Sequence, residues 1–342
     1  MNLNDSTYNT YALAREMMDT ADVVKQFDPQ RTKPFAQKIN SVGRLFFTGE
    51  GSSRLFPAKN AIRRALTWGL DVCMATDGSR QAAQYDLSNF AVFCASNSGR
   101  TKEVVILAKK LAQQGNPNRF ALTANEGTLL EQACTDTLVL TCGWENAVAA
   151  TKSVVEQALV YESLVWHLAG KDLAAELPNL SDAIRTALTL DLPESIIDAA
   201  ANAPMIYFAG YNDGVAEELT LKTNETTRQT SDYLEGTYAV HGIEEVMSEN
   251  DIVFVVDPID DEIEKFQEVL EKGVGLKIVA IANRDTPFDT IRVPDVGDLT
   301  PFVYLCAGWN LLVDIGLKLD INLDKPERAR KVGNEFVGQE HF

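Results

Sequence analysis

The chain repeats a set of short apolar runs at a nearly constant spacing, and this repeat limits the folds open to it. The run RLFFTG at residues 44–49 has the same form as MIYFAG at residues 205–210, 161 positions later. The runs 91–96 and 252–257 have the same offset of 161, and the runs 121–125 and 280–283 have an offset of 158, counted between their last residues. Strand-like runs that recur at one offset indicate a duplicated domain.

The runs are continuously apolar, which is typical of strands buried on both faces of a parallel sheet. Between them lie helical patterns, as at residues 101–114, where apolar side chains recur at helical spacing before Gly115. Residues 147–168 show a second, longer helical pattern. We therefore predict an α/β chain of two tandem doubly wound parallel-sheet domains, related by internal duplication.

Proline positions and the repeat divide the chain into parts. Pro178, Pro193 and Pro204 punctuate a helical connector between the two halves. The first 30 residues are expected to form one helix that packs across the first domain. The predicted parts are an N-terminal helical segment (1–30), a first domain with anion-binding loops (31–170), the connector (171–203), a second domain (204–320) and a C-terminal tail over the active site (321–342).

Composition excludes several classes of protein. The chain has 342 residues, of which 49 are acidic and 31 are basic, and its net charge of −18 opposes binding to nucleic acid or to an anionic membrane. The five cysteines are scattered and form no CxxC pair, so a reducing cytoplasm fits better than a disulfide framework. No apolar run approaches the ~20 residues that span a bilayer, and the N-terminus has no signal-peptide pattern.

The sequence contains no motif that is typical of a cofactor-binding site. The histidines and cysteines do not cluster as metal ligands, and no GxGxxG or Walker A sequence is present. We therefore expect no metal, no dinucleotide and no ATP, and no cofactor of any kind.

Small hydroxyl residues follow three predicted strands of the first half. In an open parallel sheet, ligands bind beyond the carboxyl ends of the strands, where helix N-termini point. Ser52 and Ser53 lie in the first loop, SNSGRT (96–101) is the second, and CGWENAVAATK (142–152) is the third. Hydroxyl and backbone N–H donors at a helix start suit a phosphate. Helix capping is the alternative for Ser52 and Ser53, whereas four donors within 96–101 exceed what a cap needs.

The second half lacks this pattern. The loop that corresponds to 96–101 reads DPIDDE at residues 257–262, and its carboxylates would repel a phosphate. One anion site per chain, in the first half, is therefore expected.

The order of these loops resembles the sugar isomerase (SIS) domain family, in particular the double-SIS isomerase module of glucosamine-6-phosphate synthases and fructosamine-6-phosphate deglycases. The family has a GTS-type turn, an SxSGxT loop and a GxExxVASTK stretch in this order, and the resemblance extends over residues 10–335. Ala150 stands where the family has serine, so one donor is missing. The resemblance implies that the phosphosugar is bound by Ser52, Ser53, Ser96, Asn97, Ser98, Thr101, Ala149 and Lys152.

Two further positions match an acid–base pair. His241 lies in a glycine-flanked loop, and an imidazole can move the proton that opens a sugar ring. Glu225, sixteen residues earlier, follows an LKxxE pattern; a solvated helix charge is the alternative for it. In the family, the glutamate moves a proton between C1 and C2 and the histidine opens the ring, so the resemblance assigns these roles to Glu225 and His241. Ile243 replaces the proline that usually follows His-Gly.

The tail contains a third match. Residues 324–332 resemble the closing DxPxxxxKxV segment of the family, in which the lysine opens the substrate and forms a Schiff base; Lys331 is the matching position. A basic tail on an acidic protein is the alternative. His167, in a predicted helix, is taken as structural, and the penultimate His341 as solvated.

These residues fit three reactions equally: aldose–ketose isomerisation, deglycation of a 6-phosphofructosamine, and deamination of a hexosamine phosphate. Each passes through an enediol or enolamine. We favour a phosphosugar isomerase, with the deglycase close behind it and a non-catalytic sugar-phosphate regulator as the competing class. No glutaminase domain is expected, because no cysteine precedes Cys73. The resemblance also implies a homodimer in which His241 reaches the neighbouring active site.

Overall fold

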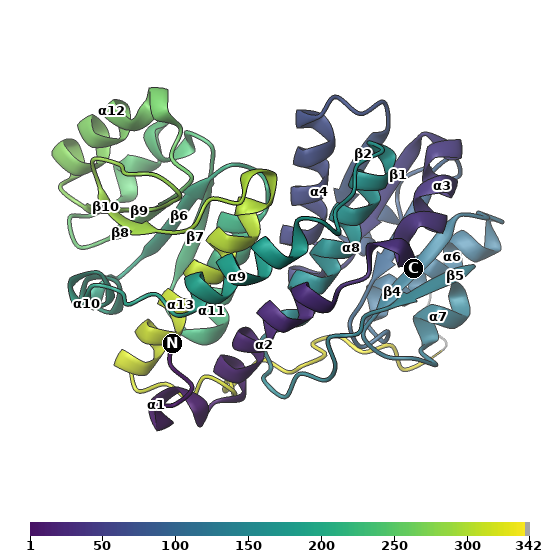
Figure 1. Ribbon diagram of the computed structural model, residues 1–342, viewed down its shortest axis with the longest axis horizontal. Coiled ribbons are helices and arrows are strands. Elements are labelled where there is room, and N and C mark those ends of the chain that lie inside the picture. The colour runs from purple at the N-terminus through teal and green to yellow at the C-terminus, as the bar shows by residue number, and fades with distance from the viewer. Residues whose placement is uncertain (339–342) are drawn as a thin grey trace. The chain divides into compact units, whose positions relative to one another are not determined.

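The computed structural model describes residues 1–338, which fall into two compact units (Figure 1). The first-sheet unit consists of Asp22–Glu145, Ala150–Leu177 and the described part of the tail from Arg330 onward. The second-sheet unit consists of Met1–Ala21, Asn146–Ala149 and Pro178–Ala329. The chain therefore passes between the units several times.

The first-sheet unit is built on a five-stranded parallel sheet of order β2-β1-β3-β4-β5 (Figure 1). Its strands are β1 (Arg44–Thr48), β2 (Cys73–Asp77), β3 (Ala91–Ala95), β4 (Arg119–Thr123) and β5 (Asp136–Val139). Its helices are η1 (Pro29–Thr32), α3 (Lys33–Val42), η2 (Gly51–Ser53), α4 (Leu55–Thr67), α5 (Ser79–Ala82), α6 (Lys102–Gln113), α7 (Leu129–Ala133) and α8 (Lys152–Leu168).

Both faces of this sheet are covered, as the continuous apolar runs predict. Phe47 and Phe93 point to the face that packs on α8, where the Phe47 ring lies 4.3 Å from that of Tyr161. The alternate residues Val92 and Cys94 pack in a core cluster with α6 and α7 on the other face. This alternation of buried side chains produces the doubly wound arrangement.

The second-sheet unit repeats this topology. Its sheet has the order β10-β9-β8-β6-β7. Read from the other edge, as β7-β6-β8-β9-β10, this is the order of the first sheet with each strand replaced by the one five places later. The strands are β6 (Ile206–Gly210), β7 (Ser231–Glu235), β8 (Ile252–Val256), β9 (Lys277–Ala282) and β10 (Asp289–Arg292). The predicted duplication and α/β fold class are therefore confirmed.

The helices of this unit include the predicted connector. They are α1 (Ser6–Asn9), α2 (Ala12–Gln26, which continues into the other unit), α9 (Leu177–Leu188), α10 (Glu194–Asn202), α11 (Val215–Thr226), α12 (Ile263–Phe266) and α13 (Thr300–Lys318). Shorter helical turns are η3 (Tyr238–Val240), η4 (Ile243–Val246), η5 (Asp260–Glu262), the π-helical η6 (Gln267–Val274) and η7 (Gly297–Leu299).

Two local expectations differ from the structure. Residues 1–30 form α1, α2 and part of η1 rather than one helix, and Met1–Ala21 belong to the second-sheet unit, where the Tyr8 hydroxyl donates to Asp314 at 2.9 Å. The helix expected at 147–168 begins at Lys152. The backbone N–H of Thr151 instead donates to the side chain of Glu145 at 2.8 Å, which ends the preceding loop.

One helix has the length and hydropathy of a membrane span. The segment Gly297–Lys318, which contains α13, passes that test, but 94% of its apolar window is buried inside the protein. It is therefore the central core helix of the second-sheet unit.

Candidate active site

The loop between β3 and α6, at residues 96–101, is a preformed cradle of hydroxyl groups. Ser96 Oγ lies 2.8 Å from Thr101 Oγ1 and 3.4 Å from Ser98 Oγ. Gly99 has a φ of +62°, and a Cβ there would lie 2.3 Å from the Cβ of Thr128, so the loop requires glycine at this position. Because α6 has 12 residues, its N-terminus also directs a positive dipole end toward the loop.

Ser52 and Ser53 lie in the turn η2, after β1. The N-cap residue of α4 is Arg54, so neither serine occupies the cap position. The backbone carbonyl of Ser53 accepts a hydrogen bond from the Gln157 amide of α8. Gly49 makes the turn possible, since a Cβ there would lie 2.9 Å from the Ser53 carbonyl oxygen.

The third loop is organised by Glu145. This buried carboxylate accepts hydrogen bonds from the N–H of Thr151 and from Ser153 Oγ, at 2.8 and 2.6 Å. Asn97, in the cradle loop, donates to Ser153 Oγ at 2.6 Å. Lys152 is buried at the first position of α8, whereas Ala149 belongs to the second-sheet unit.

The tail lies directly against the cradle loop. Its residue Glu335 forms an antiparallel bridge with Thr101, and the N–H of Phe336 donates to the carbonyl of Arg100 at 3.0 Å. Phe336 is buried in the core cluster that contains α6 and α7. The ammonium of Lys331 lies 3.6 Å from Glu145 Oε2. The structure therefore brings Lys331 and the predicted anion loop together.

Glu225 belongs to the second-sheet unit, on α11, and is paired with a buried lysine. Lys222 Nζ lies 2.9 Å from Glu225 Oε2 and 3.1 Å from Glu218 Oε1. The side chains of Lys222 and Glu218 are 1% and 0% exposed, whereas Glu225 is 33% exposed. Burial alone would lower the pKa of Lys222, but the two carboxylates raise it above its ordinary value, so it stays a cation.

Lys222 and Glu218 are not among the predicted site residues, although both pair within the helix that carries Glu225. The charges at 218, 222 and 225 follow the i, i+4, i+7 spacing of one helix face, and this spacing alone indicates that the three side chains can interact. Lys222 and Glu218 are buried, whereas Glu225 is partly exposed, so only part of this helix face meets solvent.

His241 follows η3 and is exposed. Gly242 has a φ of +105°, and its N–H donates to the Glu244 carboxylate at 2.6 Å. Ile243, where the family has proline, begins η4 and packs against the core cluster of this unit, so an apolar contact holds the loop after His241. His167 Nε2 donates to the backbone carbonyl oxygen of Pro29 at 2.8 Å in the first-sheet unit, and His341 lies outside the described residues.

The corresponding loop of the second sheet is chemically different. Arg284, which follows β9, forms ion pairs with Asp257 and Asp260 of this loop, at 2.7 and 2.9 Å. Its guanidinium charge is thus balanced by two carboxylates and is poorly suited to a phosphate.

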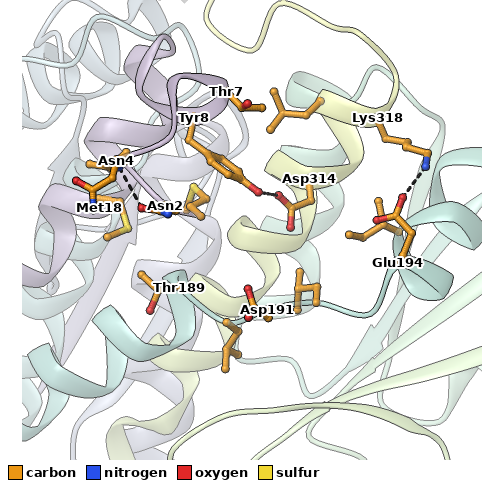
Figure 2. Close-up of a pocket in the computed structure, with 16 residues that line it drawn as sticks. Asn2, Asn4, Thr7, Tyr8, Met18, Thr189, Asp191, Glu194, Asp314 and Lys318 are labelled. Carbon is orange, nitrogen blue, oxygen red and sulfur yellow. Dashed lines mark hydrogen bonds and ion pairs between the residues drawn. The ribbon is translucent and has the colours of Figure 1, made fainter.

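The second-sheet unit also contains a pocket of about 760 Å³, shown in Figure 2, which includes none of the predicted site residues. Tyr8 donates to Asp314 across it, and Lys318 pairs with Glu194 at 2.6 Å. Burial raises the pKa of Asp314. With Asp191, Glu194 and Asp314 in its lining, this pocket does not suit an anionic ligand.

Within residues 1–338, no group of three or more His, Cys, Asp or Glu side chains is placed to hold a metal ion.

Comparisons with known proteins bear on this arrangement. No family model matches the chain. It is 26% identical over 278 residues to the glutamine–fructose-6-phosphate aminotransferase (isomerizing) of Halobacterium salinarum, a match that covers 73% of this chain and 46% of that protein. The chain thus spans about half the length of that relative.

Solved structures show the fold. The tagatose-6-phosphate ketose/aldose isomerase of Escherichia coli superposes with a TM-score of 0.77 at 16% identity, covering 94% of this chain and 97% of that one. The glucosamine-6-phosphate deaminase of Thermotoga maritima superposes with a TM-score of 0.69 at 18% identity, covering 94% and 99%. The chain therefore has the double-SIS fold, in which two α/β domains of the same topology follow one another. It is similar in that fold to sugar-phosphate isomerases and deaminases.

Proposed function

We propose that the protein is a sugar-phosphate isomerase that acts at C1 and C2 of a hexose or amino sugar with an anionic group at C6. The observation that supports this most is the Glu225 carboxylate, which is partly exposed and held by the buried ammonium of Lys222. A positioned carboxylate is the group that a proton transfer between neighbouring carbons requires.

In this proposal the cradle loop binds the C6 phosphate. Ser96, Ser98 and Thr101 supply hydroxyl donors and the N-terminus of α6 supplies N–H groups, with Ser52, Ser53, Asn97, Ala149 and Lys152 as further contacts. Hydrogen bonds to a charged oxygen are about twice as strong as neutral ones, so these donors can overcome the repulsion from the chain's net charge of −18.

The chemical steps are assigned by the same proposal. His241 moves the proton between the ring oxygen and the C1 hydroxyl, which opens the ring. Glu225 then removes the proton from C2 of the aldose while the C1 carbonyl oxygen accepts a proton, which gives the enediol. Glu225 returns its proton to C1 while the C2 hydroxyl gives up its proton to form the ketose carbonyl, so that no net proton is consumed. Lys331 is assigned the binding of the open-chain carbonyl.

Deamination of a hexosamine phosphate is the second candidate. It is supported by the similarity in fold to a glucosamine-6-phosphate deaminase and by Lys331, whose amine could form a Schiff base with a ketose carbonyl. Deglycation of a 6-phosphofructosamine uses the same residues. A non-catalytic regulator is disfavoured because it would have no use for a partly exposed carboxylate held by the buried ammonium of Lys222.

The proposal also includes a homodimer in which His241 acts on the substrate bound to the neighbouring subunit, and a cytoplasmic location. The exposure of His241, with exposed Tyr238 and Val246 beside it, is compatible with such a contact.

A panel of substrates separates these reactions. The protein is incubated with hexose 6-phosphates, hexosamine 6-phosphates and fructosamine 6-phosphates, and the products are identified by mass spectrometry together with an ammonia assay. Isomerisation gives an isomer of equal mass without ammonia, whereas deamination or deglycation releases the amine. Failure to convert any of these compounds, combined with binding of one of them, would favour the regulator.

A further inference from the structure

We propose that Glu145 is a positioning residue that holds the ammonium of Lys331 and connects it, through Ser153 and Asn97, to the anion-binding loop. An anion in that loop would then control how readily Lys331 reacts. The inference rests on the proposed function in so far as that proposal makes 96–101 the anion loop and Lys331 a substrate-binding amine.

Glu145 is a buried carboxyl group held by several hydrogen-bond donors. Its side chain is 4% exposed, and it accepts hydrogen bonds from Thr151 N–H, Thr151 Oγ1, Ser153 N–H and Ser153 Oγ at 2.6–3.3 Å. These donors lie at the N-terminus of the 17-residue helix α8, whose dipole also favours a carboxylate. The carboxylate is therefore held in place by its own loop and offers Lys331 a partner that does not move.

Lys331 is attached to this partner and, through its backbone, to the anion loop. Its ammonium lies 3.6 Å from Glu145 Oε2. Three residues further on, the carbonyl of Asn334 accepts from the N–H of Lys102 at 3.0 Å, next to the bridge between Glu335 and Thr101. The tail is thus held by the pair of Lys331 with Glu145 and by the backbone contacts of residues 334 and 335 with Lys102 and with Thr101 of the anion loop.

A second connection runs through side chains. Asn97 of the anion loop donates to Ser153 Oγ at 2.6 Å, and Ser153 Oγ donates to Glu145 Oε2 at 2.6 Å. Donors and acceptors follow one direction along this chain, an arrangement in which each hydrogen bond strengthens the next. Asn97 immediately follows Ser96, so an anion that orders the loop also stabilises the acceptor of Lys331.

The chemical consequence concerns the lone pair of the amine. An ammonium engaged by a carboxylate has no lone pair, and it cannot attack a carbonyl until it gives up a proton. Glu145 therefore keeps Lys331 in place and unreactive. An anion bound in the loop should tighten this arrangement until an open-chain carbonyl competes for the amine.

Reductive methylation of the full chain with formaldehyde and an amine-borane measures this reactivity directly. The rate for each lysine is read by peptide mass spectrometry in inorganic phosphate and in chloride at matched ionic strength. Phosphate should slow methylation of Lys331 by roughly fivefold or more, the lower range of coupling between two sites. Lys325, which belongs to the second-sheet unit, serves as the internal reference and should not respond.

Variants identify the residue responsible. Glu145→Gln should speed methylation of Lys331 and abolish the phosphate effect. Glu131→Gln, the same charge change at the cap of α7, should leave both the methylation rate of Lys331 and the phosphate effect as in the wild type. If circular dichroism shows that Glu145→Gln is unfolded, Ser153→Ala decides: the phosphate effect should be lost while the rate in chloride stays at the wild-type value. An equal Lys331 rate with and without phosphate in the wild type, or a phosphate effect that survives in the folded variants, would overturn the inference.

The two proposals fail separately. Turnover of a phosphosugar without phosphate protection of Lys331 would reject this inference alone. Protection of Lys331 without turnover of any phosphosugar would reject the proposed reaction and retain the coupling.

Discussion

Lys222 and Glu225 form an ion pair of 2.9 Å in which the ammonium is buried and the carboxylate is one-third exposed. A second carboxylate, that of Glu218, lies 3.1 Å from the same ammonium and is fully buried. The lysine therefore has one partner inside the protein and one at its surface. This geometry fixes the outer carboxylate without withdrawing it from a ligand.

Replacement of Glu225 by glutamine should remove the proton transfer and keep substrate binding. A general base contributes about 10²–10⁴-fold, so Glu225→Gln should lower kcat by that factor at a similar KM. In D₂O the wild type should place deuterium at C1 or C2, as read by mass spectrometry, and Glu225→Gln should not. The exposed Glu264→Gln on α12 is the matched control. Deuterium incorporation at the wild-type rate by Glu225→Gln would remove Glu225 from the mechanism.

Replacement of Lys222 should affect stability as well as activity. Lys222→Met leaves Glu218 as an uncompensated buried charge, and the loss of one partner from a buried ion pair costs about 3–5 kcal/mol. The free energy of unfolding is measured with urea and circular dichroism. The double variant Lys222→Met/Glu218→Gln should recover most of this loss, because no buried charge remains. A Lys222→Met chain as stable as the wild type would contradict the structural role assigned to this pair.

Loss of a hydroxyl from the cradle loop should weaken binding of phosphorylated ligands. Ser98→Ala removes a charge-assisted hydrogen bond to phosphate, which should cost about 1–3 kcal/mol in binding and raise KM accordingly. Isothermal titration with the phosphosugar measures the binding term. Ser41→Ala, at the exposed end of α3, removes a comparable hydroxyl outside the loop and should leave the affinity unchanged. Equal affinities for Ser98→Ala and the wild type would place the phosphate elsewhere.

Complementation tests the shared active site. Glu225→Ala and His241→Ala chains should each be inactive alone. After mixing and subunit exchange, up to about a quarter of the wild-type activity should return, because half of the dimers are heterodimers and each contains one intact site. The assay compares the mixture with each variant at equal total concentration. Full activity from a wild-type chain shown to be monomeric under assay conditions would exclude this arrangement.

Much of the fold follows from local sequence. The inner positions of runs such as 44–49 and 205–210 are continuously apolar, and that pattern is typical of strands covered on both faces. Their common offset predicts two copies of one sheet, and the two strand orders match. Hydroxyl residues directly after β3 lie at the carboxyl edge of the sheet by the same logic, so the cradle loop could be located before its geometry was known.

Other features depend on contacts between distant residues, and no local pattern determines those. A charge at position 218 or 222 has the same appearance in the sequence whether its helix face meets water or the core, so the burial of Lys222 required the packing of α11 in its unit. Glu145 and Lys331 are far apart in the chain, and their pairing arises because the tail bridges Thr101 and inserts Phe336 into the core. The sequence alone therefore determined the strands, their duplication and the candidate loops. The tertiary structure decided which charges are buried and which are paired, because burial and pairing depend on side chains that are brought together by folding.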